Sequence, residues 1–222
     1  MRTFLAPVFL LAVSLQFASA DWVIVQKSTT DGKSEETTTK VKGDKARTDV
    51  GGNVSMLLDS GSGSVTMLMH PQKAMMQMDG DALKGMLSMA AGALGGGNNQ
   101  PAAKPAPTGE KEKIGSYDTE IYTWSGPLGT GKFWVAKDFP NWRELGAMQD
   151  KIMKAMGGAM ASLAPPSSDF PGMIVKSEMK VMGKTVISEV VSAKEEPVAD
   201  DVFALPTDYQ KMEMPKLPGA GK

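Results

Sequence analysis

The segment VTMLMHPQKAMMQM, residues 65–78, predicts two short strands joined by a turn at Pro71-Gln72. If these two residues form the loop, Met67 faces Met76 across the pair and His70 faces Lys73. Every second side chain then lies on one apolar face, and the other face is mostly polar. This pattern is typical of an antiparallel sheet that contacts water on one side. The mostly polar face comprises Thr66, Leu68, His70, Lys73, Met75 and Gln77.

Similar short strands precede and follow this hairpin. Turn signals such as Asp31-Gly32 and Met182-Gly183 separate runs that are rich in β-branched, aromatic or threonine residues. Short strands at this spacing predict an antiparallel sheet. We expect two strands within 22–42 and further strands at 45–49, 54–59, 117–124, 132–136, 173–181 and 184–193.

Two segments carry apolar residues at helical spacing instead. The first is 79–94, and the second runs from Asn141, a candidate N-cap, to Leu163. The segment 95–109 is rich in Gly, Asn, Pro and Ala, which predicts a flexible loop. The expected class is therefore α+β, an antiparallel sheet with two amphipathic helices.

The first twenty residues have the three-part order of a secretory signal peptide. Arg2 gives a positive start, residues 4–13 form a short apolar run, and Ala18-Ser19-Ala20 fits a signal peptidase. A spanning helix needs ~20 apolar residues, and neither this run nor any later one is that long. We therefore expect cleavage before Asp21 and export to the periplasm or beyond the cell. The expected organisation is a signal peptide at 1–20, a single domain at 21–209 with the flexible segment 95–109, and a disordered tail at 210–222.

The composition excludes several classes of function. The formal net charge is −1, and loss of Arg2 with the leader makes it −2, so neither nucleic acid nor an anionic membrane is an expected partner. Cysteine is absent, which excludes thiol catalysis and cysteine metal sites. The single histidine, His70, cannot make a zinc site of the usual composition, and its place beside a turn predicts a solvated side chain. No cofactor is expected.

Two short motifs match catalytic signatures only in part. Residues 126–133, GPLGTGKF, resemble a phosphate-binding loop, but Phe133 stands where the magnesium ligand belongs and the chain continues as a strand. A hairpin turn is the preferred interpretation. The Gly-x-Ser-x-Gly pattern that often accompanies a serine–histidine–acid triad is absent. These observations favour a protein without enzymatic activity.

A family resemblance covers nearly the whole mature chain. Its most telling part is the closing pattern Phe203-x-Leu205-Pro206-x-x-Tyr209. The chain resembles a family of exported bacterial proteins, domain of unknown function 4412, which is similar to the half-barrel of the lipoprotein carriers LolA and LolB. The resemblance implies a strongly curved antiparallel sheet with helices over its concave face, and it implies no catalytic residues. The other matching segments are 43–47, 58–59, 69–73, 133–138 and 171–173.

The abundance of methionine leaves two classes of function open. The chain has 18 methionines, and this flexible, polarisable side chain adapts a core to irregular contents. The leading hypothesis is a non-enzymatic cell-envelope binding protein that encloses an apolar or acyl-chain ligand, and its alternative is a structural scaffold without ligand. The second class is copper handling, because thioethers bind Cu(I). The candidate cavity residues are Met67, Met76, Met148, Ile152 and Met156, and the candidate copper ligands are Met67, Met69, Met76, Met78 and His70.

Overall fold

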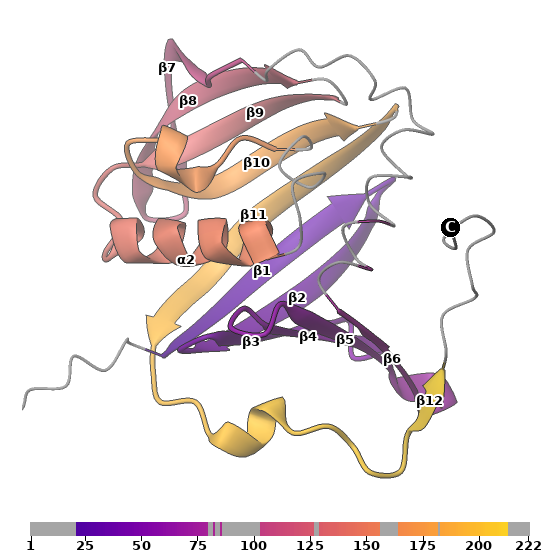
Figure 1. The fold of residues 1–222 in the computed structure, drawn as a ribbon. Coiled ribbons are helices and arrows are strands. Elements are labelled where there is room, and N and C mark those ends of the chain that lie inside the picture. The colour runs from indigo at the N-terminus through magenta and orange to yellow at the C-terminus, as the bar shows by residue number, and fades with distance from the viewer. Residues whose placement is uncertain are drawn as a thin grey trace, which may run out of the picture.

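The computed structural model describes residues 21–79, 82, 85, 103–126, 129–155, 164–181 and 183–212. Within this part the protein is mostly β, and twelve strands form one open sheet (Figure 1). The strand order is β12-β6-β5-β4-β3-β2-β1-β11-β10-β9-β8-β7. All neighbours are antiparallel except β12 and β6, which pair in parallel. The expected signal peptide, 1–20, lies outside the described residues.

Nine strands precede the helix in the described part of the chain. They are β1 (Trp22–Thr30), β2 (Lys33–Lys42), β3 (Lys45–Val50), β4 (Val54–Asp59), β5 (Ser64–Met69), β6 (Ala74–Met78), β7 (Ala106–Ile114), β8 (Tyr117–Gly126) and β9 (Gly129–Ala136). After the helix come β10 (Met173–Val181), β11 (Lys184–Glu195) and β12 (Gln210–Met212).

Turn chemistry explains the tight hairpins of this meander. Thr30 pairs with Lys33, so Asp31 and Gly32 alone make the first turn, and both have positive φ angles of 51° and 78°. Two successive positive φ angles match the twist of the flanking strands, and glycine adopts them without steric cost. The predicted turn at Asp31-Gly32 is confirmed.

The methionine-rich hairpin has the expected register but a different turn. Met67 pairs with Met76, as predicted. The ladder, however, ends at Met69 and Ala74, and the connection is a short 3-10 helix, η1 (His70–Gln72), closed by Lys73 at a φ of 46°. Proline suits the start of a helical turn better than the first position of a two-residue hairpin loop, which explains the longer connection.

One long-range pairing joins the two halves of the chain. β1 lies between β2, its neighbour in sequence, and β11, whose residues are about 160 positions away. From β11 the sheet continues through β10, β9 and β8 to the edge strand β7. β7 begins at Ala106, so the last four residues of the segment expected to be flexible, 95–109, belong to a strand.

A single α-helix, α2 (Trp142–Ala155), is present among the described residues, and it lies across one face of the sheet in Figure 1. Leu145 of α2 is fully buried, and the carbonyl of Asn141 accepts the Leu145 N–H at 3.1 Å. We call the side of the sheet that carries α2 the helix face. The expected helix ran to Leu163, and residues 156–163 lie outside the described part.

The expected half-barrel needs correction in two respects. The sheet is neither closed nor strongly curled, and it is mixed because β12 pairs in parallel with β6. The described chain is mostly β, with α2 as the one helix whose residues are described in full. The other expected helix, 79–94, falls outside the described residues apart from Ala82 and Gly85. Twelve strands side by side spread the sheet so widely that a helix of 14 residues covers only part of it.

The opposite face of β3–β6 is covered, and the prediction that it contacts water is wrong. Residues 196–212, which we call the C-terminal strap, run beneath these strands in Figure 1. Leu68 and Met75, expected on a mostly polar face, are 1% and 4% exposed and pack with Leu57 and Tyr209. β12 belongs to the strap, so the first three residues of the expected tail, 210–222, are ordered against β6.

Among the described residues, no helix is both long enough and apolar enough to cross a membrane.

Candidate functional site

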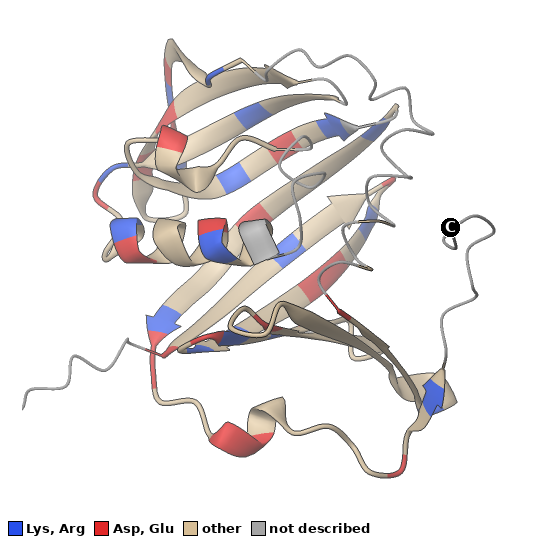
Figure 2. Cartoon of the chain, viewed as in Figure 1, with Lys and Arg blue, Asp and Glu red and all other residues tan. Residues whose placement is uncertain are grey.

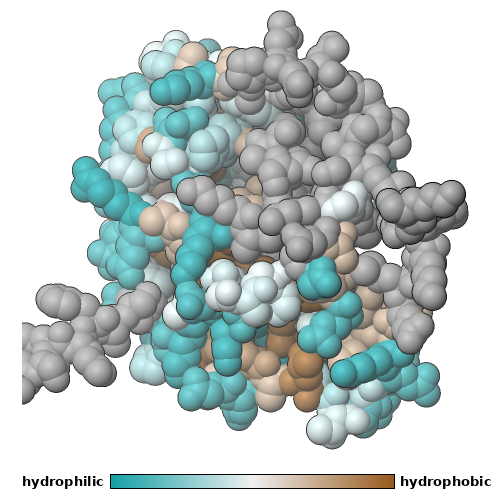
Figure 3. Space-filling model, viewed as in Figure 1, coloured by the Kyte–Doolittle hydropathy of each residue, from teal (hydrophilic) through white to brown (hydrophobic). Residues whose placement is uncertain are grey.

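A pocket of about 700 Å³ lies between α2 and the helix face of the sheet. Side chains of β1, β2, β3, β9, β10 and β11 form its floor, and α2 and the segment 164–168 form its wall. In Figure 3 hydrophobic surface is visible in the middle of this face, bordered by hydrophilic side chains. The apolar lining residues are Ile24, Phe133, Met148, Ile152, Met153, Ile174, Val175, Met179 and Val190, with Ala164, Pro165 and Pro166.

The wall of the pocket is fixed by contacts of the segment after the helix, to α2 on one side and to the sheet on the other. The carboxylate of Asp150 accepts the backbone N–H groups of Ser167 and Ser168, at 2.7 and 3.1 Å, and so ties the helix to the 3-10 turn η2 (Ser167–Asp169). Phe170, which follows η2, is 2% exposed and packs against Phe133 on β9. Both contacts hold the segment after the helix close to the sheet.

The floor of the pocket carries a strip of uncharged polar side chains. Thr39 and Thr48 face each other on β2 and β3 with their hydroxyl oxygens 3.1 Å apart. Gln26 on β1 continues the strip, and each of these three side chains is half-buried. The strip ends at Ser177 and Ser188, which pair across β10 and β11.

The structure brings only part of the predicted cavity set together. Met148 and Ile152 line the pocket, whereas Met67 and Met76 lie further along the sheet on β5 and β6 and do not line it. Met156 is outside the described residues. Strand periodicity marks Ile24 and Gln26 as one face of β1. The sequence does not show that β11 pairs with β1 or that β10 follows β11 in the sheet, so the floor of the pocket was missed.

Of the candidate copper ligands, Met67, Met69, Met76 and Met78 share one face of the β5–β6 hairpin, and His70 is separated from them. Met67 and Met76 form a register pair, and Met56 on β4 extends the same row, because it pairs with Met67 on the other side. His70 does not join them. Its ring lies on the opposite face of the sheet, where both ring nitrogens have partners.

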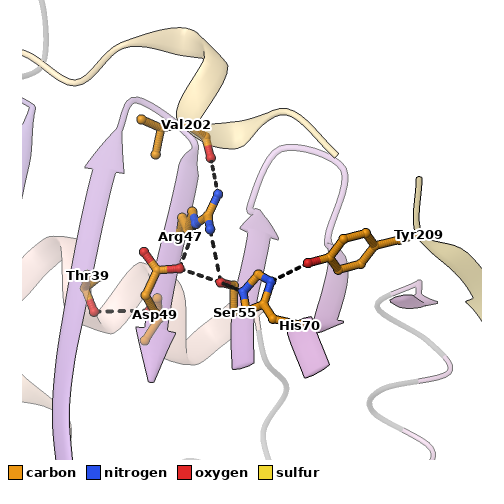
Figure 4. Close-up of polar contacts among 8 residues, drawn as sticks. Thr39, Arg47, Asp49, Ser55, His70, Val202 and Tyr209 are labelled. Carbon is orange, nitrogen blue, oxygen red and sulfur yellow. Dashed lines mark hydrogen bonds and ion pairs between the residues drawn. The ribbon is translucent and has the colours of Figure 1, made fainter. Parts of the chain in front are cut away.

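Those partners belong to a polar network between the sheet and the C-terminal strap (Figure 4). Arg47 donates to the carboxylate of Asp49 at 2.8 Å and to the Val202 carbonyl at 3.0 Å. The Ser55 hydroxyl donates to the same carboxylate oxygen and accepts from Arg47 at 3.1 Å. We call the side chains of Arg47, Asp49, Ser55, His70 and Tyr209 the strap network.

The histidine completes the chain of hydrogen bonds. His70 Nε2 lies 2.7 Å from Ser55 Oγ, and Nδ1 lies 2.6 Å from the hydroxyl of Tyr209. Because Ser55 gives its only proton to Asp49, Nε2 donates to Ser55, and Nδ1 accepts from Tyr209. The prediction of a solvated His70 is therefore wrong, since the strap supplies a partner from 139 positions away.

The serine of this network is poorly placed for nucleophilic catalysis. Ser55 is fully buried, at 0% exposure, and its hydroxyl makes one donated and two accepted hydrogen bonds. A nucleophile needs access to substrate and a base that takes its proton. Here the proton points to Asp49 and the histidine donates, so the arrangement fastens the strap to the sheet.

Burial alone would raise the pKa of the Asp49 carboxyl. The hydrogen bond from Ser55 and the ion pair with Arg47 outweigh that effect, so the pKa lies below its ordinary value. The carboxylate is thus held ionised beneath the strap.

Two further motifs are placed by the structure. Gly126 pairs with Gly129 and β9 follows at once, so the segment resembling a phosphate-binding loop joins two strands, as preferred from the sequence. In the described part of the chain, no group of three or more His, Asp or Glu side chains is arranged to hold a metal ion.

Comparisons with known proteins give a family and several structures of low sequence identity. The family described as "Domain of unknown function (DUF4412)" matches residues 23–209. No curated protein matches the sequence. The fold is similar to PNGF-II, with 13% identity, a TM-score of 0.43, and coverage of 87% of this chain but 31% of PNGF-II. It is also similar to a DUF1329 family protein from Desulfovibrio piger, with 11% identity, a TM-score of 0.36, and coverage of 85% and 91% of the two chains.

Proposed function

This chain belongs to the family described as Domain of unknown function (DUF4412), and we propose that it is a non-enzymatic binding protein of the cell envelope. Its ligand is an apolar molecule or acyl chain, held in the pocket between α2 and the sheet. The lipoprotein carriers LolA and LolB offer an analogy for such a protein, and export by the expected leader at residues 1–20 would bring it to the same compartment.

The pocket is the single observation that supports this proposal most. Its volume of about 700 Å³ lies within the ~300–1,000 Å³ typical of small-molecule sites. Most of its lining is apolar, and three of the apolar side chains, Met148, Met153 and Met179, are methionines, which can adjust their shape to a flexible chain.

A charge placed in the pocket tests the proposal. Met148→Asp puts a carboxylate against the apolar lining, where it is costly unless it is paired or neutralised. We expect the variant to lose at least ~10-fold in affinity for a neutral fluorescent probe with an acyl chain. Fluorescence titration of the purified mature protein measures this loss.

The neighbouring residue provides a matched control. Ala147 is exposed on the same helix, so Ala147→Asp adds the same charge outside the pocket and should leave the affinity unchanged. Far-UV circular dichroism checks that both variants are folded. A wild-type protein that binds no apolar probe, or equal losses in both variants, contradicts the proposal.

The methionine row Met56–Met67–Met76 supports copper handling as a second candidate. These three side chains lie in register on adjacent strands and are half-buried. Directly opposed side chains on neighbouring strands have Cβ atoms ~5 Å apart, close enough for flexible thioethers to share one Cu(I). Titration with Cu(I) tests this candidate. Saturable binding that the double variant Met67→Leu, Met76→Leu abolishes would favour copper, because leucine keeps the bulk without the sulfur.

A further inference from the structure

We propose that the pocket beneath α2 selects an uncharged amphiphile, a single acyl chain whose polar end offers hydroxyl or amide groups. This inference rests on the proposed function and deepens it, because it names the chemical class of the ligand. A fatty-acid anion should then bind weakly.

The charges around the pocket support this choice. No Lys, Arg or His occurs among the lining residues that the structure describes. The only charged one is Asp150, and both of its carboxylate oxygens already accept backbone N–H groups of η2. A ligand carboxylate or phosphate inside the pocket would find no cation among the described lining residues, and Asp150 would repel it. A ligand ammonium would lose its hydration shell, and the one carboxylate near it already accepts two backbone N–H groups.

Strand alternation accounts for the missing cations. Successive side chains of a strand point to opposite faces. Three of the polar lining residues have a lysine as their neighbour on the strand, and that lysine points to the opposite face. The pairs are Gln26 with Lys27, Thr39 with Lys40, and Ser177 with Lys176. Lys176 instead lies over the ring of Trp134, 4.4 Å from its centroid. Figure 2 shows the same pattern along β10, where charged and uncharged positions alternate.

The polar strip supplies the groups that a neutral ligand end needs. The hydroxyls of Thr39, Thr48, Ser177 and Ser188 and the amide of Gln26 can each donate and accept a hydrogen bond. They lie on the sheet, whereas Met148 and Ile152 lie on the helix. An acyl chain against α2 and a hydroxyl-bearing end against the strip would satisfy both sides of the pocket.

Three ligands with the same palmitoyl-length chain test the inference on the wild-type protein. Monopalmitoylglycerol is neutral, palmitate is anionic and palmitylamine is cationic. Displacement of the neutral fluorescent probe, at pH 8 and below the critical micelle concentrations, gives their relative affinities. We expect monopalmitoylglycerol to bind at least ~10-fold more tightly than either charged ligand.

A cation introduced in the strip should change the preference. Ser188→Lys places an ammonium in the pocket and should improve palmitate relative to monopalmitoylglycerol by ~10-fold. Val191→Lys is the control, since Val191 lies on the same strand and is 60% exposed. If Ser188→Lys fails to fold, Gln26→Lys makes the same test from β1.

The outcomes separate this inference from the proposed function. Palmitate or palmitylamine binding as tightly as the neutral ligand overturns the inference and leaves the proposed function intact. An unchanged preference in folded Ser188→Lys or Gln26→Lys also overturns it. Failure of all three ligands and of the probe to bind overturns the proposed function itself.

Discussion

At the scale of single residues, the hydroxyl of Tyr209 forms the hydrogen bond that joins the end of the strap to the sheet. It is the partner of His70 Nδ1 at 2.6 Å, and the ring packs against Leu57, Leu68 and Met75. The closing pattern of the sequence thus ends on the residue that anchors the strap.

Tyr209→Phe keeps the ring and removes this hydrogen bond. We expect the free energy of unfolding to fall by about 1 kcal/mol, because a partly buried ring nitrogen loses its partner. Urea denaturation measures the change. Tyr117→Phe is the control, since no side-chain hydrogen bond of Tyr117 is found in the described part of the chain. Equal effects in the two variants would show that the hydroxyl contributes nothing.

Asp49 should make stability depend on pH. Its folded-state pKa lies below the ordinary value, so the unfolded chain binds the proton more tightly, and the stabilisation is complete above the unfolded pKa of about 3.9. It is lost as the pH falls through the folded pKa. In Asp49→Asn the free energy of unfolding should therefore fall less steeply below about pH 4 than in the wild type.

Urea denaturation at a series of pH values tests this, and the difference between variant and wild type removes the contribution of the other carboxylates. Asp200→Asn is a useful comparison. Its carboxyl is also held below the ordinary pKa by Lys42, but the pair is exposed, and exposed ion pairs contribute little. An Asp49→Asn profile parallel to that of the wild type would contradict the argument.

At the scale of elements, the C-terminal strap acts as a cover for the outer side of β3–β6. Lys42 donates to the Val198 carbonyl at 2.8 Å, Lys73 pairs with Asp208 at 2.8 Å, and Gln210 N–H donates to the Lys73 carbonyl at 2.8 Å. These contacts run the length of the strap, so its two ends are held independently.

A chain that ends at Thr207 should lose the far end of the cover. Without Tyr209 and β12, Leu68 and Met75 become exposed, and we expect stability to drop on the order of 3 kcal/mol. Hydrogen exchange of the β5 and β6 amides should accelerate with it. A chain that ends at Met212 keeps every described contact of the strap and is the control. Identical stabilities for the two chains would show that the strap is dispensable.

At the scale of the whole molecule, β1 connects two groups of strands. β2–β6 continue the sheet on one side of it and β11–β7 on the other. The main apolar cluster crosses this junction, since it contains Val41 and Leu58 from one group and Trp134 and Val175 from the other.

The shared core predicts a single cooperative unfolding transition. Amides of β4–β5 and amides of β8–β9 should lose protection at the same urea concentration in hydrogen-exchange mass spectrometry. Tryptophan fluorescence and far-UV circular dichroism should give the same midpoint. Two separated transitions would mean that the groups fold as independent units.

The sequence by itself determined the local structure where the signal lies in neighbouring residues. Alternation in 65–78 predicted the pairing of Met67 with Met76, and Asp31-Gly32 predicted a two-residue turn, because side-chain direction and turn geometry depend on adjacent residues. The amphipathic pattern after Asn141 likewise predicted α2 and placed Met148 and Ile152 on its pocket side.

Only the tertiary structure decided what covers each face of the sheet. Alternation separates the two faces of a strand but does not say which one is buried, and here the strap buries Leu68 on the face expected to be wet. The pairing of β1 with β11 and the contact of His70 with Tyr209 join residues more than 130 positions apart. Such contacts arise from the free energy of packing the whole chain, so no short segment carries their signal.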